Sequence, residues 1–178
     1  MYQRGSFLYT ESRQLRAKVL KMKYRAPNFS LVLILPNSNN IDDLFKRMLN
    51  TNAMMSAMDN LRREDVEIYL PKFNINVANK LKFPTITANV KEIFNNKTSD
   101  LKDIASCNKP YVSEILQKVS FEVDEYGLGD TKVVDFPEPE EYSKPSRYQR
   151  KYQFKADRPF AFALLYMDYW FTIGAMVR

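Results

Sequence analysis

The chain has 178 residues, 45% of them apolar and 13% aromatic, with a formal net charge of +6. This length and composition are typical of one globular domain. The sequence contains no histidine and only four glycines, which excludes Ser-His-Asp and Cys-His catalytic pairs, histidine metal ligands and glycine-rich phosphate-binding loops. Its positive charges include no run of five lysines or arginines, so a nucleic-acid- or polyanion-binding domain is a remote alternative. We therefore expect a protein that is not an enzyme and that uses no metal and no cofactor.

The first elements predicted along the chain are a buried strand and two helices. Residues 30–36, SLVLILP, form a continuous apolar run of the kind found in strands that are buried on both faces. Asn40 is the expected N-cap of the next element, a helix. The apolar stripe of this helix comprises Ile41, Leu44, Phe45, Met48 and Leu49. A second helix is predicted over residues 53–62, and we expect its methionines to fill gaps in the core.

Further along the chain, apolar and polar residues alternate in segments that are predicted to be strands. The alternation covers residues 66–70 and 73–77. A third helix is predicted over residues 85–94. A long strand is predicted over residues 115–123, with apolar residues on one face and Gln117 as the polar member of that face. We expect Gln117 to be a polar core residue whose hydrogen bonds are satisfied.

One segment breaks these patterns. Residues 124–150 contain two of the four glycines and three prolines. The acidic Asp135, Glu138, Glu140 and Glu141 are followed by the basic Lys144, Arg147, Arg150 and Lys151. A loop of this length inside a compact domain is usually functional or disordered. The segment is therefore the first candidate for a functional region.

The last apolar stretch, Phe160–Val177, is long enough to cross a membrane, but Asp168 lies at its middle, where a charge would cost about 3 kcal/mol in a bilayer. Its tyrosine, phenylalanine, tryptophan and threonine content favours strands. We therefore predict a buried β-hairpin, Phe160–Tyr166 and Trp170–Val177, and no membrane span. The N-terminal sequence MYQRGSFLYT shows no signal peptide, and the single cysteine, Cys107, cannot form an internal disulfide.

Several motifs follow one another in a characteristic order. They are EDVEIYLPKFNI, SDLKDIASCNKPYVSEILQKVSFEVDEYG, FKADRPFAF and WFTIGAMVR. Together with MYQRGSFLY, AKVLKMKY and SLVLILP near the start of the chain, they resemble the C-terminal half of a serpin, a protein of the serine-protease-inhibitor superfamily.

This resemblance implies an α+β, partial serpin-like fold, with mostly antiparallel sheets B and C, short helices and an exposed reactive-centre-like loop. Residues 1–178 would be the C-terminal portion of a single serpin domain, and residues 124–153 would be the loop. A complete serpin is about twice as long, so the strand over residues 115–123 would have an open edge with no partner for its backbone groups. The resemblance also implies an extracellular protein whose partner is a serine protease.

In inhibitors of this family the loop is a bait. A protease cleaves it and forms an acyl-enzyme, and the N-terminal part of the loop then inserts as a strand into the central sheet. By the resemblance, the hinge of the loop comprises Glu125, Gly127, Leu128, Gly129, Asp130 and Lys132. Insertion would bury Asp130 and Lys132, and each buried ion costs several kcal/mol unless it is well paired. Pro137 and Pro139 would each remove a hydrogen-bond donor from the ladder, so the hinge indicates lost or weak inhibition.

Two interpretations of the loop stay open. The loop can be cleaved without trapping the protease, or the protein can be a functional serine-protease inhibitor whose sequence is truncated at the N-terminus. Counting forward from the hinge puts the scissile bond near Glu141-Tyr142, whereas counting back from the FKADRPF signature puts it within residues 145–150. Arg147 and Arg150 would suit a trypsin-like protease.

Four residues of the FKADRPF match, Asp157, Arg158, Pro159 and Phe160, are structural by the resemblance. They would position the strand that follows the loop. Gln117 stands where the family often has a histidine, and its amide can likewise donate and accept hydrogen bonds.

Overall fold

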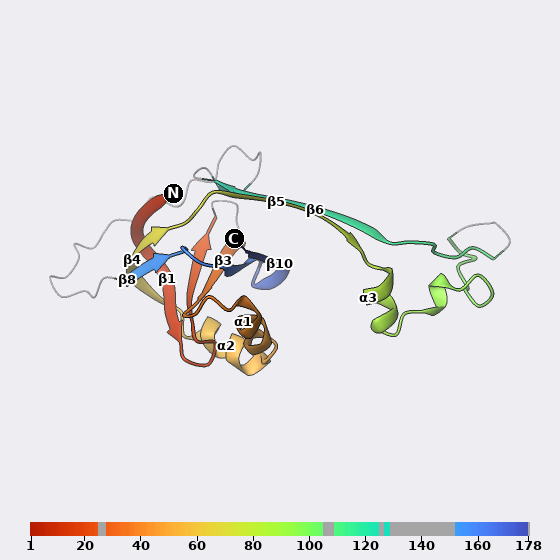
Figure 1. Ribbon diagram of the computed structural model, residues 1–178, viewed down its shortest axis with the longest axis horizontal. Coiled ribbons are helices and arrows are strands. Elements are labelled where there is room, and N and C mark those ends of the chain that lie inside the picture. Colours follow the sequence, from red (N-terminus) through yellow and green to blue (C-terminus); the bar gives the residue numbers. More distant parts are fainter. Residues whose placement is uncertain (25–27, 105–108, 125–126, 129–151, 178) are drawn as a thin grey trace. The chain divides into compact units, whose positions relative to one another are not determined.

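The computed structural model describes residues 1–24, 28–104, 109–124, 127–128 and 152–177 (Figure 1). The chain divides into two compact units. The larger unit comprises Met1–Phe73 and Glu122–Arg178, and the smaller unit comprises Asn74–Phe121. The fold is α+β and mostly sheet, as the sequence predicts.

A seven-stranded sheet forms the framework of the larger unit (Figure 1). Its strands are β1 (Tyr2–Ser12), β2 (Ala17–Lys23), β3 (Phe29–Pro36), β4 (Arg62–Tyr69), β8 (Tyr152–Lys155), β9 (Phe160–Tyr166) and β10 (Tyr169–Met176). Their order in the sheet is β10-β9-β3-β2-β1-β4-β8. Every neighbouring pair is antiparallel except β4 and β8, which are parallel.

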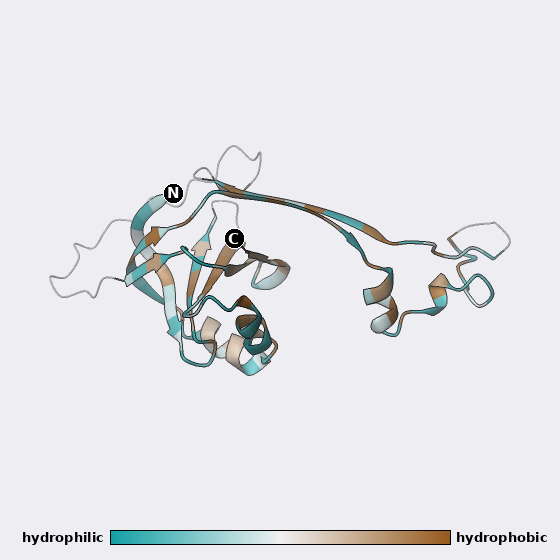
Figure 2. Ribbon diagram, in the orientation of Figure 1, coloured by the Kyte–Doolittle hydropathy of each residue, from teal (hydrophilic) through white to brown (hydrophobic). Residues whose placement is uncertain are grey.

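The central strand β3 is buried on both faces, which confirms the prediction from its continuous apolar run. Figure 2 shows hydrophobic colouring along β3. The predicted C-terminal β-hairpin is confirmed as β9 and β10. The prediction that it is buried is correct for β9, except at Tyr166, but wrong for β10, whose residues are exposed or half-buried.

Two short helices, α1 (Ile41–Met48) and α2 (Thr51–Asp59), pack onto one face of this sheet. Asn40 caps α1 as predicted, because its side-chain Oδ1 accepts a hydrogen bond of 3.0 Å from the Asp43 backbone amide. Asn50 caps α2 in the same way. The core beneath the helices comprises Leu15, Ala17, Val19, Val32, Ile34, Leu44, Ala53, Met54, Ala57, Leu61, Ala161, Ala163 and Leu165.

The three-stranded sheet has the order β5-β6-β7, with β5 (Phe73–Lys80), β6 (Leu116–Asp124) and β7 (Gly127–Leu128). The helix α3 (Lys82–Thr87) and a 3-10 turn (Glu92–Phe94) belong to the smaller unit. Among the described residues of the smaller unit, only Phe121 is buried. The backbone hydrogen bonds of this unit include one of 2.9 Å from the Leu81 amide to the Ile115 carbonyl, which joins the two ends of the segment between β5 and β6.

Three helix predictions are wrong in their extent. The second helix begins at Thr51, because Asn50 caps it, and ends before Arg62, because Arg62 begins β4. The third predicted helix, residues 85–94, is instead α3 and the separate 3-10 turn. Asn89, with φ 65°, has the left-handed conformation that ends helices. Leu49 lies at the end of α1 and is exposed, not part of the apolar stripe.

Candidate reactive-loop hinge on strand β6

The hinge region predicted from the sequence begins at the C-terminal end of β6. Gly127 and Leu128 form β7 and pair antiparallel with β6, with Val123 opposite Leu128 and Asp124 opposite Gly127. The chain therefore reverses its direction directly after β6. β7 lies on the opposite edge of β6 from β5.

The open edge predicted for the long strand is present along part of β6. β5 lies along one edge of β6, and the described residues of β7 pair with Val123 and Asp124 on the other edge. Among the described residues, no strand pairs with residues 116–120 on that second edge. A row of backbone amides and carbonyls there is available to one further antiparallel strand.

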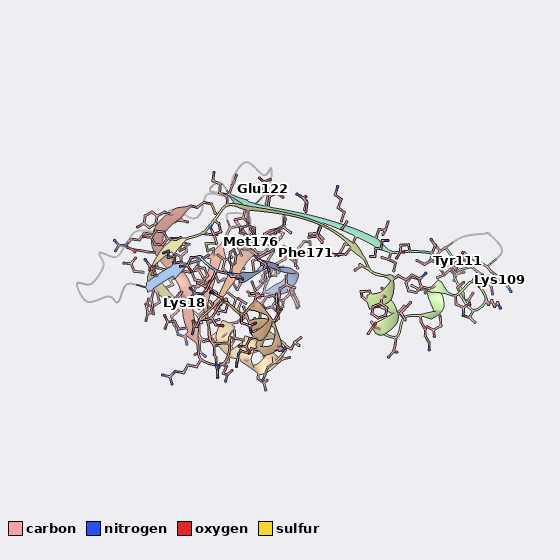
Figure 3. The ribbon with its side chains drawn as sticks, in the orientation of Figure 1. Lys18, Lys109, Tyr111, Glu122, Phe171 and Met176 are labelled. Carbon is pink, nitrogen blue, oxygen red and sulfur yellow. The ribbon has the colours of Figure 1, made fainter. Side chains whose placement is uncertain are left out.

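The two faces of β6 differ in burial. Phe121 and Val123 are 6% and 1% exposed, and Val119 is half-buried on the same face. Residues of the other face are exposed, including Glu122 near the end of β6, which Figure 3 labels. Polar and apolar colours alternate along β6 in Figure 2. A strand added at the open edge would therefore have one apolar and one exposed face.

Gln117 is not a core residue. It is exposed, and its Oε1 accepts a hydrogen bond of 3.4 Å from the Asn79 side-chain amide. The prediction failed because the buried part of this face begins nearer the end of the strand, at Phe121. The amide is hydrogen-bonded as expected, but across the surface of the sheet.

Most of the predicted loop residues lie outside the described residues. These are Glu125, Gly129, Asp130, Lys132, Pro137, Pro139, Glu141, Tyr142, Arg147 and Arg150. Cys107, which is not part of the loop, also lies outside the described residues. Tyr152 and Gln153, which the sequence assigns to the end of the loop, belong to β8. The loop thus joins β7 in one sheet to β8 in the other.

The far end of the loop is anchored at the edge of the seven-stranded sheet. β8 pairs with β4, with Val66 opposite Tyr152. The ring of Tyr152 lies 4.8 Å from that of Tyr9, and Lys18 Nζ donates a hydrogen bond of 2.9 Å to the Gln153 carbonyl. Sequence reasoning missed this strand, although the alternation of Tyr152 and Phe154 with polar neighbours is a weak signal for it.

The FKADRPF signature connects β8 to β9 and joins two other strands. The Ala156 amide donates to the Tyr69 carbonyl at 2.8 Å. Arg158 Nε donates to the carbonyl of Pro36, the last residue of β3, at 2.7 Å, and its guanidinium also pairs with Asp157. Phe160 then begins β9 with 1% of its side chain exposed. These contacts fix where β9 starts.

A surface pocket of about 460 Å³ lies between α2 and the β9–β10 hairpin. It is lined by Thr51, Met54, Met55, Met58, Asp59, Leu165, Asp168 and Trp170. At its rim, Lys21 Nζ donates a hydrogen bond of 2.5 Å to Asp168. This contact and the charge of Lys21 lower the pKa of Asp168. Of the pocket methionines, Met54 is buried as predicted, whereas Met55 is exposed.

Within the part of the chain that the structure describes, no group of three or more histidine, cysteine, aspartate or glutamate side chains could hold a metal ion. None of the helices among the described residues is long and apolar enough to cross a membrane. The described residues therefore offer one candidate functional feature that agrees with the sequence motifs, the hinge at the end of β6.

Comparison with known proteins finds relatives that are similar in sequence to most of this chain. Antichymotrypsin-2 of Bombyx mori is 31% identical over 128 residues, which are 71% of this chain and 34% of that protein. Serpin I2 of Homo sapiens is 30% identical over 124 residues, 70% of this chain and 30% of that protein. Alaserpin of Manduca sexta is 32% identical over 121 residues, 67% of this chain and 31% of that protein.

The chain spans about a third of the length of the curated relatives it matches. The family profile described as "Serpin (serine protease inhibitor)" matches residues 1–172. This match covers six strands of the seven-stranded sheet, the first half of β10, the hinge segment and the FKADRPF signature. The chain belongs to the serpin family.

Proposed function

We propose that this chain is part of an extracellular serpin whose loop is cleaved by a serine protease without trapping it. The antiparallel register of β6 with β7 carries the proposal. If the chain continued along the open edge of β6 in the same register, Asp130 would lie opposite Phe121. Lys132 would then lie opposite Val119, because the two positions move in opposite directions along antiparallel strands.

Directly opposite residues in an antiparallel pair project from the same face of the sheet. Asp130 and Lys132 would thus join the face on which Phe121 is buried and Val119 is half-buried. Asp130 and Lys132 would be same-face neighbours about 7 Å apart along one strand, a spacing at which their charges pair poorly. Burying each ion without a close partner costs several kcal/mol. We infer that this cost slows or prevents insertion beyond the hinge.

A functional inhibitor is the second candidate, and one observation favours it. Gly127 and Leu128 pair with β6 as the first residues of an inserted strand would. In the same register, Pro137 and Pro139 would lie beyond Leu116, the first residue of β6. They would not interrupt a ladder on β6, so the proposal rests on the two charges and not on the prolines.

Incubation of the full-length protein with trypsin-, chymotrypsin- and elastase-like proteases separates the two candidates. We expect cleavage of the loop, no covalent complex that survives denaturing electrophoresis, and little gain in thermal stability after cleavage. A detergent-resistant complex with any of these proteases would contradict the proposal. It would support the functional inhibitor instead.

A loop variant tests the physical reason. Asp130→Thr combined with Lys132→Ala would give the inward positions uncharged side chains, and we expect this variant to gain thermal stability on cleavage. The matched control is Asp135→Ala, which removes a charge at a position opposite Leu116, on the exposed face. The control should behave like the unmodified protein. If both variants gain the same thermal stability on cleavage, the charges of Asp130 and Lys132 are not what prevents insertion.

The mass of the released C-terminal fragment identifies the scissile bond. A trypsin-like protease would cut after Arg147 or Arg150, whereas the count from the hinge places the cut at Glu141-Tyr142. Arg147→Ala and Arg150→Ala, tested separately, should each abolish cleavage only if that arginine is the bait residue. Cleavage at a bond outside residues 129–151 would exclude this segment as the bait.

A further inference from the structure

The smaller unit contains an acceptor motif that the hinge and loop do not use. Residues Asn96, Lys97 and Thr98 form the pattern N-x-T, in which the asparagine of a secreted protein can carry an N-linked glycan. A second copy of the pattern, N-x-S, begins at Asn28. The two sites differ in how the structure presents them.

Asn96 lies at an exposed turn. The preceding residue, Asn95, holds the turn, because its side-chain Oδ1 accepts a hydrogen bond of 2.9 Å from the Lys97 amide. The Asn95 carbonyl also accepts from the Ser99 amide at 2.9 Å. The side chains of Asn96 and Thr98 are both exposed. The side-chain amide of Asn96 has no hydrogen bond to any residue that the structure describes. Both groups that define the motif are therefore accessible.

The motif at Asn28 is presented differently. Its Ser30 lies within β3 and is 5% exposed. Ser30 pairs with Lys23 on one side and with Leu165 on the other. In the folded chain the Ser30 hydroxyl is therefore out of reach of a transferase, although Asn28 itself is exposed. The Asn28 motif supplies an internal comparison for Asn96.

We propose that Asn96 is an N-glycosylation site of this protein. In this reaction the Asn96 amide nitrogen, Nδ2, forms a bond to the anomeric carbon of an oligosaccharide carried on a lipid pyrophosphate. The bond from that carbon to the pyrophosphate oxygen breaks, and the lipid pyrophosphate leaves with the electron pair. The Nδ2 proton passes to a base of the transferase, and nothing is oxidised or reduced. The inference rests on the proposed extracellular function, because only chains in the secretory pathway meet this donor.

The test uses full-length protein recovered from the medium of cells that make it. Peptide-N-glycosidase digestion in heavy-oxygen water converts a glycosylated asparagine to labelled aspartate, and fragment masses then locate the label. We expect the label on Asn96 and not on Asn95, its neighbour. Asn96→Gln and Thr98→Ala should each remove the glycan and increase the electrophoretic mobility. Thr98→Ser should retain the glycan, because serine supplies the same hydroxyl, and Asn95→Gln should also retain it.

Secreted protein with an unmodified Asn96 would overturn this inference and leave the proposal for the loop intact. Loss of the glycan in Thr98→Ser as well as in Thr98→Ala would also overturn it, since a glycan that depends on the motif must tolerate serine. Unmodified protein found only in the cytosol would overturn both this site and the extracellular assignment. A covalent complex with a protease would contradict the proposed function alone.

Discussion

Gly174 of β10 lies directly opposite Phe162 of β9, and the aromatic ring of Phe162 occupies the space that a side chain at Gly174 would need. A Cβ atom at Gly174 would lie 2.5 Å from the Cζ atom of the ring. The ring cannot move away freely, because Phe162 is 3% exposed and its centroid lies 5.4 Å from that of Phe73. Glycine at this position therefore lets β10 pack directly against the ring of Phe162, which contacts Phe73.

Gly174→Ala should destabilise the protein by about 1–3 kcal/mol, because the added methyl group overpacks a closed core site. Urea unfolding of the full-length protein measures this change. Ile173→Val is the matched control, since Ile173 is the neighbouring residue and is exposed. Its effect should stay within about 0.5 kcal/mol. Combining Gly174→Ala with Phe162→Leu should cost less than the sum of the two single changes, and strict additivity would refute the proposed clash.

Arg158→Lys should lower the free energy of unfolding by about 1–2 kcal/mol. The Arg158 Nε donates to the Pro36 carbonyl at 2.7 Å, and a lysine ammonium cannot reproduce both this bond and the contact with Asp157. Asp157→Asn is the control, because it removes only the partly exposed ion pairs with Arg158 and Lys155 and should cost at most about 0.5 kcal/mol. Equal losses for the two variants would mean that the bond to Pro36 contributes little.

The contact of Arg158 with Pro36 shows where prediction from the sequence stops. β3 and β9 were predictable, because their long apolar runs leave few alternatives to a buried strand. The cap at Asn40 was predictable from the residue type and the apolar stripe that follows it. Which carbonyl Arg158 would contact was not predictable, because Pro36 is far away in the sequence and only the completed sheet brings them together.

The same limit explains the errors at the hinge and in the smaller unit. The burial of Phe121 and the exposure of Gln117 depend on what packs against one end of β6, which periodicity does not encode. The third helix stopped early because Asn89 adopts φ 65°, a conformation that asparagine permits but does not require. The register of β7 on β6 required the backbone pairing itself.

Asp168→Asn should weaken the protein at neutral pH by at most about 1 kcal/mol, because the pair with Lys21 is largely exposed on the carboxylate side. The hydrogen bond from Lys21 lowers the pKa of Asp168 below its ordinary value of 3.8. The stabilisation is therefore present above pH 3.8 and is lost as the pH falls through the lower pKa of the folded state. Unfolding curves of the two proteins should converge at that pH.

The substitution by asparagine adds no backbone strain. Asp168 has φ 68°, and asparagine adopts this left-handed conformation about as readily as aspartate. Asp100→Asn is the control, because the pair of Asp100 with Lys102 is exposed on both sides. Its effect should not exceed about 0.5 kcal/mol at any pH. A stability difference for Asp168→Asn that is independent of pH would contradict the ion pair as its cause.

Met167→Asn should stabilise the protein by about 0.5–1 kcal/mol. Met167 has φ 48° and Asp168 has φ 68°, which is the pattern of a type I′ hairpin turn. The left-handed conformation is costly for methionine and less so for asparagine. Met55→Asn is the comparison, because Met55 is similarly exposed but lies in α2, where asparagine should destabilise by about 0.5 kcal/mol. A loss of stability in Met167→Asn would show that the methionine side chain contributes more than the turn conformation costs.

The segment between β7 and β8 links two sheets that share no strand. One end is fastened to β6 by two residue pairs, and the other is fastened to β4 by four. A single cut in the segment would remove this covalent tether without breaking any pairing within either sheet. The ends at β7 and β8 would then be separate, while the chain between β4 and β5 would still join the two sheets.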